Sequence, residues 1–466
     1  MDTSWSPNLA DTDGPKYLTL ARALRDAVRQ GALSEGAQLP TVRDLAWRLA
    51  VTPGTVSRAY QLAIQEGLLQ ATVGRGTFVA ARNLRLGPSQ ALYPERDQGV
   101  EAGRVDLRSP QLPEVGQIAA MAEAMRRLAG QIGPDWLSYT SQSGEEPLRE
   151  AVCTWLDDRL LGAFGADDIM LTHGGQNGIG LILACCLRGD RPVVLSDDLA
   201  YPGFRYAARL ARAEVVGIEM DAEGIRPEAL EAACRKHIAQ LLFLTPEAQN
   251  PTTARMSAQR RADIVAIVRK HDLQIIEDEC YAVTLSDLPS LRALAPERCW
   301  YLGSLSKSFS AALRFGFVVC PTGMGAAGRL TAQHGFFALS RPVAELCLDL
   351  FRTGAAVEIR ARVQKEMSER LQMMVNRLGA YDLCWQPGIP FAWLRLPLGW
   401  RASNFTRMAE QGGVLVRPAD QYALVHGRAP NAVRLAVPAN VPRQQLDAGL
   451  AGLGYLLGRP PSDMAV

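Results

Sequence analysis

The chain has 466 residues, 48% of them hydrophobic, and a formal net charge of only +2, so it is long enough for two or three domains that each bury a core. Its longest nearly uninterrupted apolar run, residues 178–187, is about half as long as a membrane-spanning helix must be, and its N-terminus is acidic and polar where a signal peptide is basic and then apolar. Nine cysteines without CxxC pairs and five histidines argue against disulfides, zinc and metal catalysis, so we expect a cytoplasmic protein with reduced thiols and no metal ion.

The first part of the chain shows the sequence patterns of amphipathic helices. Apolar residues recur on one face of residues 16–30, and Gly31 follows as a stop. A second, shorter helix follows Thr41, which is placed as an N-cap with Asp44 at the third helical position, an arrangement that resembles a capping box. These segments predict two amphipathic helices.

A third helix completes this module, with Thr52 as N-cap and Pro53 at the first helical position, where a missing N–H costs nothing; it is expected to end at Gly67. Two short helices joined by a tight turn, the second opening with small polar residues, are typical of a helix-turn-helix, whose second helix lies in the major groove of DNA. Two short β runs around residues 74–76 predict a hairpin wing with a basic tip. The alternative is a dimerisation or packing module.

Residues 39–79 resemble the winged helix of GntR-type bacterial regulators, and the likeness covers residues 16–80 or so. The resemblance implies double-stranded operator DNA as a partner and places six residues along it: Arg43, Thr52, Gly54, Thr55, Arg58 and Arg75. Pro53 stands where such domains usually have an arginine, so one expected DNA contact is missing. Residues 1–86 carry ten basic and seven acidic residues, a surplus that suits a polyanion but also arises by chance.

Residues 81–104 lack any sustained period and carry Pro, Gly and charges, so we interpret them as a linker of about 25 residues. From residue 105 onward, helical stretches alternate with seven short β runs, at residues 168–174, 192–198, 214–220, 240–246, 273–279, 299–305 and 315–321. This alternation predicts an α/β domain built on a largely parallel sheet that is covered on both faces. In such sheets ligands bind at the carboxyl ends of the strands.

The residues that follow these runs form a set: Gly174, Gly175, Gln176, Tyr201, Asn250, Asp278, Tyr281, Ser304, Ser306, Lys307 and Arg314. Small residues that open a helix let backbone N–H groups approach a phosphate. An acid can keep a pyridine nitrogen protonated, and a lysine amine can form a Schiff base. Singly, each residue has an ordinary structural explanation, such as a glycine turn, a core tyrosine or a solvated lysine. Together, in this order, they specify pyridoxal phosphate (PLP).

The strands between residues 169 and 318 resemble the large domain of fold-type I PLP-dependent aminotransferases. The resemblance implies that Lys307 is the catalytic lysine that forms the Schiff base and that Asp278 pairs with the pyridine nitrogen. It implies the remaining cofactor contacts as well: Asn250 and Tyr281 at the ring oxygen, Tyr201 stacked on the ring, and Ser304, Arg314 and the amides of Gly175 and Gln176 at the phosphate, with Ser306 as a further cofactor-binding residue.

Residues 387–397, 412–422 and 432–438 resemble the small domain of the same fold. An arginine in the last of these motifs binds the carboxylate of an amino acid in that fold, which implies the same role for Arg434; a surface arginine at a strand edge is the alternative. Because a planar guanidinium suits a carboxylate, an α- or ω-amino acid effector is expected.

The sequence thus predicts a winged helix at residues 1–80, a linker at 81–104 and an aminotransferase-like domain at 105–466. The last of these has a large part at about 130–330 and a small part at about 340–466. This arrangement resembles that of the MocR/GabR group of bacterial regulators. The resemblance implies a transcriptional regulator that senses PLP, an amino compound joined to it as an aldimine, or both. It also implies a homodimer, in this group a domain-swapped head-to-tail form, that lies at the nucleoid when it is bound to its operator.

Two alternatives remain at this point: a genuine aminotransferase that carries an accessory winged helix, and a purely structural or interaction protein. The segment 308–317 lacks the Pro-Gly pair that relatives often have before Leu-Arg, and Cys280 stands where many have an acid or an aromatic residue. These departures change the floor of the pocket, so the effector of a relative is not assigned to this chain.

Overall fold

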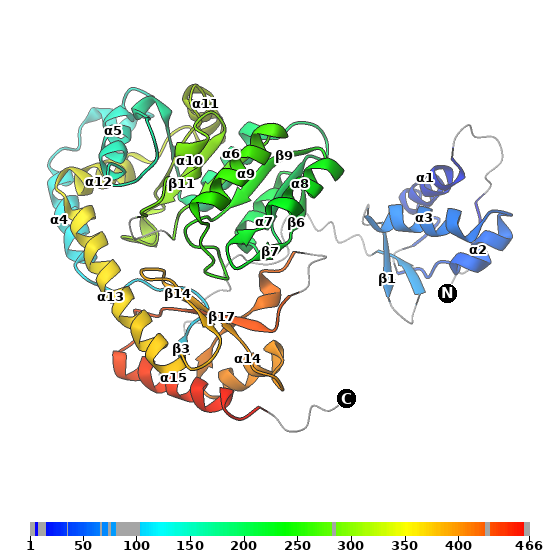
Figure 1. Ribbon diagram of the computed structural model, residues 1–466. Helices are drawn as coiled ribbons and strands as arrows, with labels where there is room; N and C mark the ends of the chain where they lie inside the picture. The colour runs from blue at the N-terminus through cyan, green and yellow to red at the C-terminus, as the bar shows by residue number, and fades with distance from the viewer. Residues whose placement is uncertain are drawn as a thin grey trace. The chain divides into compact units, whose positions relative to one another are not determined.

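The computed structural model describes residues 5–7, 15–34, 36–65, 68–72, 76–80, 103–281, 286–424 and 429–460. The chain divides into two compact units, Met1–Gln90 and Ala91–Val466, which are described one at a time. Figure 1 labels their helices and strands. Within the described residues, every helix is too short or too polar to cross a bilayer.

The first unit contains three helices and a two-stranded antiparallel hairpin: α1 (Lys16–Arg29), α2 (Val42–Arg48), α3 (Pro53–Gln65), β1 (Leu69–Thr72) and β2 (Gly76–Val79). Leu24, Leu45 and Val56, one from each helix, are fully buried together and form the centre of its core. The three helices and the hairpin expected from the sequence are therefore confirmed.

The two threonines predicted as N-caps form the expected hydrogen bonds at the N-termini of α2 and α3. Thr41 Oγ1 accepts a hydrogen bond from the Asp44 amide at 3.2 Å, and Thr52 Oγ1 accepts one from the Thr55 amide at 3.3 Å. Pro53 is the first residue of α3. Each cap satisfies an N–H that the helix itself leaves without a partner.

Three expectations for this part of the chain fall outside the described residues. They are the end of the third helix at Gly67, the wing tip with Arg75, and residues 81–102 of the linker. The described part of α3 ends at Gln65.

A seven-stranded sheet forms the centre of the second unit. In sheet order its strands are β4 (Ile169–Thr172), β12 (Gly316–Val319), β11 (Cys299–Ser304), β10 (Gln274–Asp278), β9 (Ala239–Leu244), β5 (Val193–Asp197) and β6 (Glu214–Ile218). Neighbouring strands are parallel except at β12, which runs antiparallel to both β4 and β11. The seven expected strands and the largely parallel sheet are confirmed.

Helices cover both faces of this sheet (Figure 1). Along β9, Leu241 and Phe243 pack in one core cluster, whereas Leu242 and Leu244 pack in another. The first cluster lies under α6 (Gly175–Cys186), α7 (Pro202–Leu210) and α11 (Gly325–Phe336), and the second lies under α8 (Pro227–Lys236), α9 (Ala258–Lys270) and α10 (Leu291–Leu294). A strand buried on both faces explains its continuous apolar sequence.

The C-terminal part of the second unit carries a four-stranded antiparallel sheet in the order β13 (Leu383–Cys384), β14 (Phe391–Arg395), β17 (Ala432–Ala436) and β16 (Arg417–Pro418). Beside it, β3 (Val105–Asp106) pairs in parallel with β15 (Val414–Leu415). The start of this unit is therefore joined to its C-terminal part. This unit also contains the hairpin β7 (Met220–Asp221) and β8 (Gly224–Ile225), and the helices α4 (Gln117–Ala129), α5 (Glu146–Trp155), α12 (Arg341–Arg352), α14 (Ala402–Gln411) and α15 (Arg443–Leu457).

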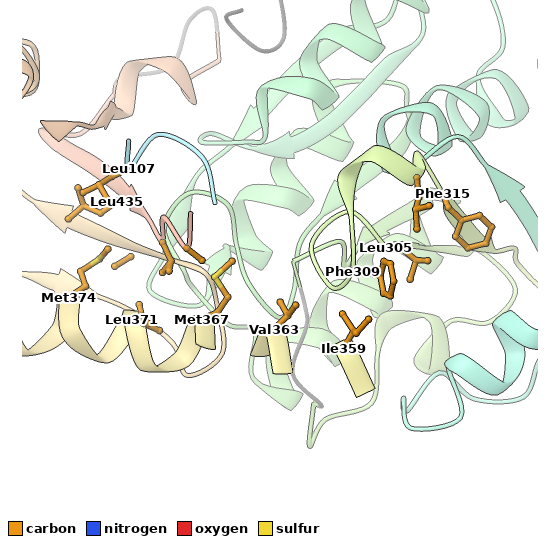
Figure 2. Close-up of a cluster of buried hydrophobic side chains, with 14 of the residues drawn as sticks. Leu107, Leu305, Phe309, Phe315, Ile359, Val363, Met367, Leu371, Met374 and Leu435 are labelled. Carbon is orange, nitrogen blue, oxygen red and sulfur yellow. The ribbon is translucent and has the colours of Figure 1, made fainter. Parts of the chain in front are cut away.

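The long helix α13 (Ala355–Leu378) packs against both parts of the second unit (Figure 1). Its buried apolar residues recur at helical spacing and form the α13 stripe, which consists of Ile359, Val363, Met367, Leu371 and Met374. Figure 2 shows the first half of this stripe near Leu305, Phe309 and Phe315 and the second half near Leu107 and Leu435. One contiguous core therefore ties the turn that carries Lys307 to the strand that carries Arg434.

Truncation of the α13 stripe is expected to destabilise the second unit. Leu371→Ala removes a side chain that is 2% exposed and should lower the free energy of unfolding by about 2–5 kcal/mol, since it leaves a cavity in the core. Urea unfolding followed by tryptophan fluorescence measures this loss. Val357→Ala is the control on the same helix, because Val357 is 47% exposed and should change stability by about 0.5 kcal/mol or less. Equal effects of both variants would contradict the proposed role of the stripe.

Candidate functional site

A cavity of about 280 Å³ opens where several strands of the large sheet end. The ten residues that the sequence predicts as cofactor contacts all line it: Gly175, Gln176, Tyr201, Asn250, Asp278, Tyr281, Ser304, Ser306, Lys307 and Arg314. Ile179, Thr245, Cys280 and Ala311 complete the described part of the wall. Thr245 was not predicted, although it directly follows β9 (Ala239–Leu244) and its hydroxyl accepts a hydrogen bond from the Asn250 backbone amide at 3.3 Å.

Lys307 lies in a tight turn between β11 and β12. Leu305 and Phe309, two residues to either side of it, are fully buried. The Ser304 hydroxyl donates to Ser306 Oγ at 2.9 Å and accepts from the Ser306 amide at 3.0 Å. The turn is thus held by apolar anchors and a serine pair, while the lysine amine lies 5.5 Å from the centre of the Tyr281 ring.

The N-terminus of α6 forms the cationic end of the cavity. Gly174 precedes the helix with φ +80°, a conformation that favours glycine, and a Cβ there would come within 2.8 Å of the Arg314 guanidinium. Arg314 Nη2 donates to the His173 carbonyl at 3.1 Å. The first amides of a helix have no intrahelical acceptor, so those of Gly175 and Gln176 can bind an anion beside this arginine.

Asp278 is the last residue of β10 and forms the acidic end of the cavity. Burial raises the pKa of its carboxyl above the usual range, and a hydrogen bond from the Cys280 amide at 3.1 Å only partly offsets this effect. Within the described residues, Asp278 forms no ion pair. A protonated pyridine nitrogen would supply the missing hydrogen-bond donor and charge.

Asn250 connects the cavity to the C-terminal sheet. It is 2% exposed, and its Oδ1 accepts a hydrogen bond from Arg434 Nη1 at 2.8 Å. Arg434 Nη2 donates to the Arg108 carbonyl at 2.9 Å. The arginine predicted to bind a carboxylate is therefore a buried residue of β17 beside the cavity. This geometry argues against the alternative of a surface arginine at a strand edge.

Tyr201 and Gly203 form another wall. A Cβ at Gly203 would come within 2.3 Å of the Tyr201 ring and 2.2 Å of Gln176 Oε1, so glycine is what permits this packing. The side-chain amide of Gln176 donates through Nε2 to the Gly203 carbonyl at 2.8 Å. Its buried Oε1 accepts no hydrogen bond from the described residues.

These observations fit PLP. The cavity offers a lysine amine, a half-buried carboxylate that forms no ion pair within the described part of the chain, an anion-binding helix N-terminus with an arginine, and glycines where side chains would fill the space. When bound, PLP supplies an aldehyde that condenses reversibly with primary amines. We therefore retain the cofactor roles given above as proposals for these residues.

The residues expected to contact DNA lie on α2 and α3 of the first unit. Arg43, Thr52, Gly54 and Arg58 are exposed, and Thr55 is partly buried. The Arg58 guanidinium lies 4.1 Å from the centre of the Tyr17 ring, a cation–π contact that restricts the direction of this side chain on the recognition helix α3. Arg75, the sixth residue of the set, lies outside the described residues.

The fold and the site define a class of protein: a winged helix joined to a fold-type I aminotransferase domain that carries a PLP-type site. Residues 106–453 match aminotransferase class I and II, and residues 16–79 match the bacterial regulatory proteins of the gntR family. The chain belongs to the aminotransferase class I and II family, in the group of HTH-type transcriptional regulators with a gntR-family N-terminal domain. The expected MocR-type arrangement is thereby confirmed, and the family implies PLP as the cofactor.

The relatives include regulators and enzymes. An uncharacterized HTH-type transcriptional regulator of Bacillus subtilis, YdeF, is 31% identical over 97% of both chains. The pyridoxine biosynthesis regulator PdxR of Corynebacterium glutamicum is 28% identical over 65% of both chains. Among solved structures, the α-aminoadipate aminotransferase LysN of Thermus thermophilus is 26% identical with a TM-score of 0.66, covering 77% of this chain and 92% of its own.

Attachment of PLP to Lys307 can be tested directly. We expect the protein loaded with PLP to show a visible absorbance band, and borohydride reduction to fix the cofactor on the peptide that contains Lys307, because this is the lysine among the cavity-lining residues. Lys307→Ala should bind PLP weakly and without a covalent link. Lys365→Ala is the control, since Lys365 is an exposed residue of α13. A wild-type protein without the adduct would overturn the assignment.

Proposed function

We propose that this chain is a DNA-binding transcriptional regulator that senses PLP, an amino compound joined to PLP, or both. The observation that carries the proposal is that one cavity gathers all ten predicted cofactor contacts in a chain that also contains a gntR-family winged helix. In this proposal Lys307 holds the cofactor, Asp278 keeps its ring nitrogen protonated, and Tyr201 stacks on the ring. Asn250 and Tyr281 orient it through the ring oxygen.

The proposed effector is an amino acid whose carboxylate contacts Arg434. Arg434 and Asn250 are hydrogen-bonded to each other, so an incoming carboxylate would compete with Asn250 for the guanidinium. A guanidinium binds a carboxylate, which is charged and can accept two parallel hydrogen bonds, more strongly than it binds a neutral amide oxygen. The exchange would change the position of Asn250 beside the cofactor, which gives effector binding a route to the cofactor end of the cavity.

We further propose a homodimer, which the family resemblance extends to a domain-swapped head-to-tail form. An aromatic pair supports a self-association surface: the Tyr139 and Phe337 rings stack at 5.1 Å between centres although they are 81% and 66% exposed. Leu137, two residues before Tyr139 in the sequence, is 91% exposed. Exposed apolar groups of this size favour a protein partner. We place the protein in the cytoplasm and, when it binds its operator, at the nucleoid.

Operator binding should depend on Arg58. Arg58→Ala should weaken binding to DNA from upstream of the protein's own gene by about 1–3 kcal/mol, because it removes a contact of the recognition helix. Fluorescence anisotropy at several salt concentrations measures the loss, and affinity should fall with salt as counterions are released. Arg22→Ala, an exposed arginine on α1, is the control. Unchanged affinity after deletion of residues 1–80 would refute DNA binding by this module.

A second experiment separates the regulator from the alternative of a genuine aminotransferase. An amino acid effector should change the visible spectrum and the operator occupancy while turnover stays slow or undetectable, because sensing needs only binding and amine exchange. Arg434→Ala should lose this response and retain the cofactor band, whereas Arg395→Ala, an exposed arginine of β14, should respond normally. Sustained turnover of about 1 per second or more with an ordinary amino donor and keto acid would support the enzyme instead.

A further inference from the structure

A second, smaller cavity of about 20 Å³ adjoins the cofactor cavity. Tyr201, Asn250 and Tyr281 line both cavities, so the two share a wall. Arg417 and Arg434 line the smaller one, which is large enough for about one water-sized polar group. A carboxylate oxygen is a group of that size.

The two arginines form a cross-strand pair. Arg417 of β16 lies directly opposite Arg434 of β17 in the antiparallel ladder. Directly opposite residues of an antiparallel pair point to the same face of the sheet, with Cβ atoms about 4.5–5.5 Å apart, and like charges at such positions destabilise the sheet. This arrangement therefore has a cost that an anion between the guanidinium groups would remove.

Arg417 lacks a counter-ion in the described part of the chain. It forms no ion pair there, and its Nε is buried without a hydrogen-bond acceptor. The Tyr422 ring lies beside both arginines, 6.0 Å from Arg417 Cζ and 5.2 Å from Arg434 Cζ. Burial raises the pKa of the Tyr422 hydroxyl, and the guanidinium groups of Arg434 and Arg417, which act on it, partly offset that rise. Its O–H donates to no acceptor among the described residues. Two donors of the cavity wall, Arg417 Nε and the Tyr422 hydroxyl, therefore have no hydrogen-bond acceptor among the described residues.

The segment that carries Tyr422 is fixed to the large part of the unit. The Ala200 amide donates to the Tyr422 carbonyl at 3.0 Å, and Arg205 Nη1 donates to the Ala423 carbonyl at 2.6 Å. Ala200 immediately precedes Tyr201, which lines both cavities. The position of the two donors relative to the cofactor cavity is therefore set by hydrogen bonds and not by a free loop.

We infer that the effector carries two acidic groups: its α-carboxylate binds Arg434, and a second acid at the other end of the molecule binds Arg417 and the Tyr422 hydroxyl. This inference rests on the proposed function, since it specifies the class of amino compound that the cofactor site senses. The ligand class is a dicarboxylic α-amino acid. The second acid follows from the donors that the α-carboxylate on Arg434 would leave unfilled, namely Arg417 Nε and the Tyr422 hydroxyl.

Matched acid and amide pairs test the inference in the PLP-loaded, full-length protein. L-glutamate and L-glutamine, and L-aspartate and L-asparagine, have nearly the same shape and differ in the charge of the second group. Titration followed by the visible spectrum should give at least one acid that binds about tenfold or more tightly than its amide, as expected for a hydrogen bond to a charged group. Arg417→Gln should reduce that ratio to about 1, and Arg417→Lys should restore part of it.

The control variant is Arg395→Gln, an exposed arginine on the same sheet that pairs with Asp382; it should keep the wild-type ratio. Each variant must first show the cofactor band, which verifies that the site is folded. Equal binding of every acid and its amide by the wild type, or an equal loss of both ligands in Arg417→Gln, would overturn the inference and leave the proposed function intact. A wild-type protein without any cofactor band would instead overturn the proposed function.

Discussion

The α13 stripe is the packing interaction on which both ends of the candidate site depend. Leu305 and Phe309, which flank Lys307, and Leu435, the neighbour of Arg434, belong to the same core cluster as the stripe. Protein interiors are densely packed and transmit displacements. Because a single helix contacts the turn under the amine and the strand beside the arginine, the distance between these two groups is set by the core and not by the loops around the cavity (Figure 2).

The polar groups at the two cavities differ in how well they are paired. The Ser304 and Ser306 hydroxyls are hydrogen-bonded to each other, whereas two charged side chains, Asp278 and Arg417, are exceptions that form no ion pair within the described residues. Partial burial makes a charge without a counter-ion costly. The two exceptions lie in adjoining cavities and carry opposite charges, so the site is complementary to a ligand that is positive at one end and negative at the other.

Much of this could be predicted from the sequence, because strands buried on both faces are read from continuous apolar runs, and their carboxyl ends must meet at one edge of a sheet. That reasoning places Lys307 and Asp278 near each other correctly. It does not reveal Arg417, because β16 has only two residues and no apolar pattern, and the residue matters only through its register with Arg434. The antiparallel direction of β12 and the pairing of β3 with β15 depend on tertiary contacts that no local pattern encodes.

The hydrogen bond between Asn250 and Arg434 has a thermodynamic consequence. Asn250 lines both cavities, so any ligand that takes the guanidinium away from it also changes a group that borders the cofactor. Two binding events that share one residue are linked, and the linkage is reciprocal: whatever factor the acid imposes on cofactor affinity, the cofactor imposes on affinity for the acid. In the proposed function, the cell's supply of vitamin B6 would therefore shift the acid concentration at which the protein responds.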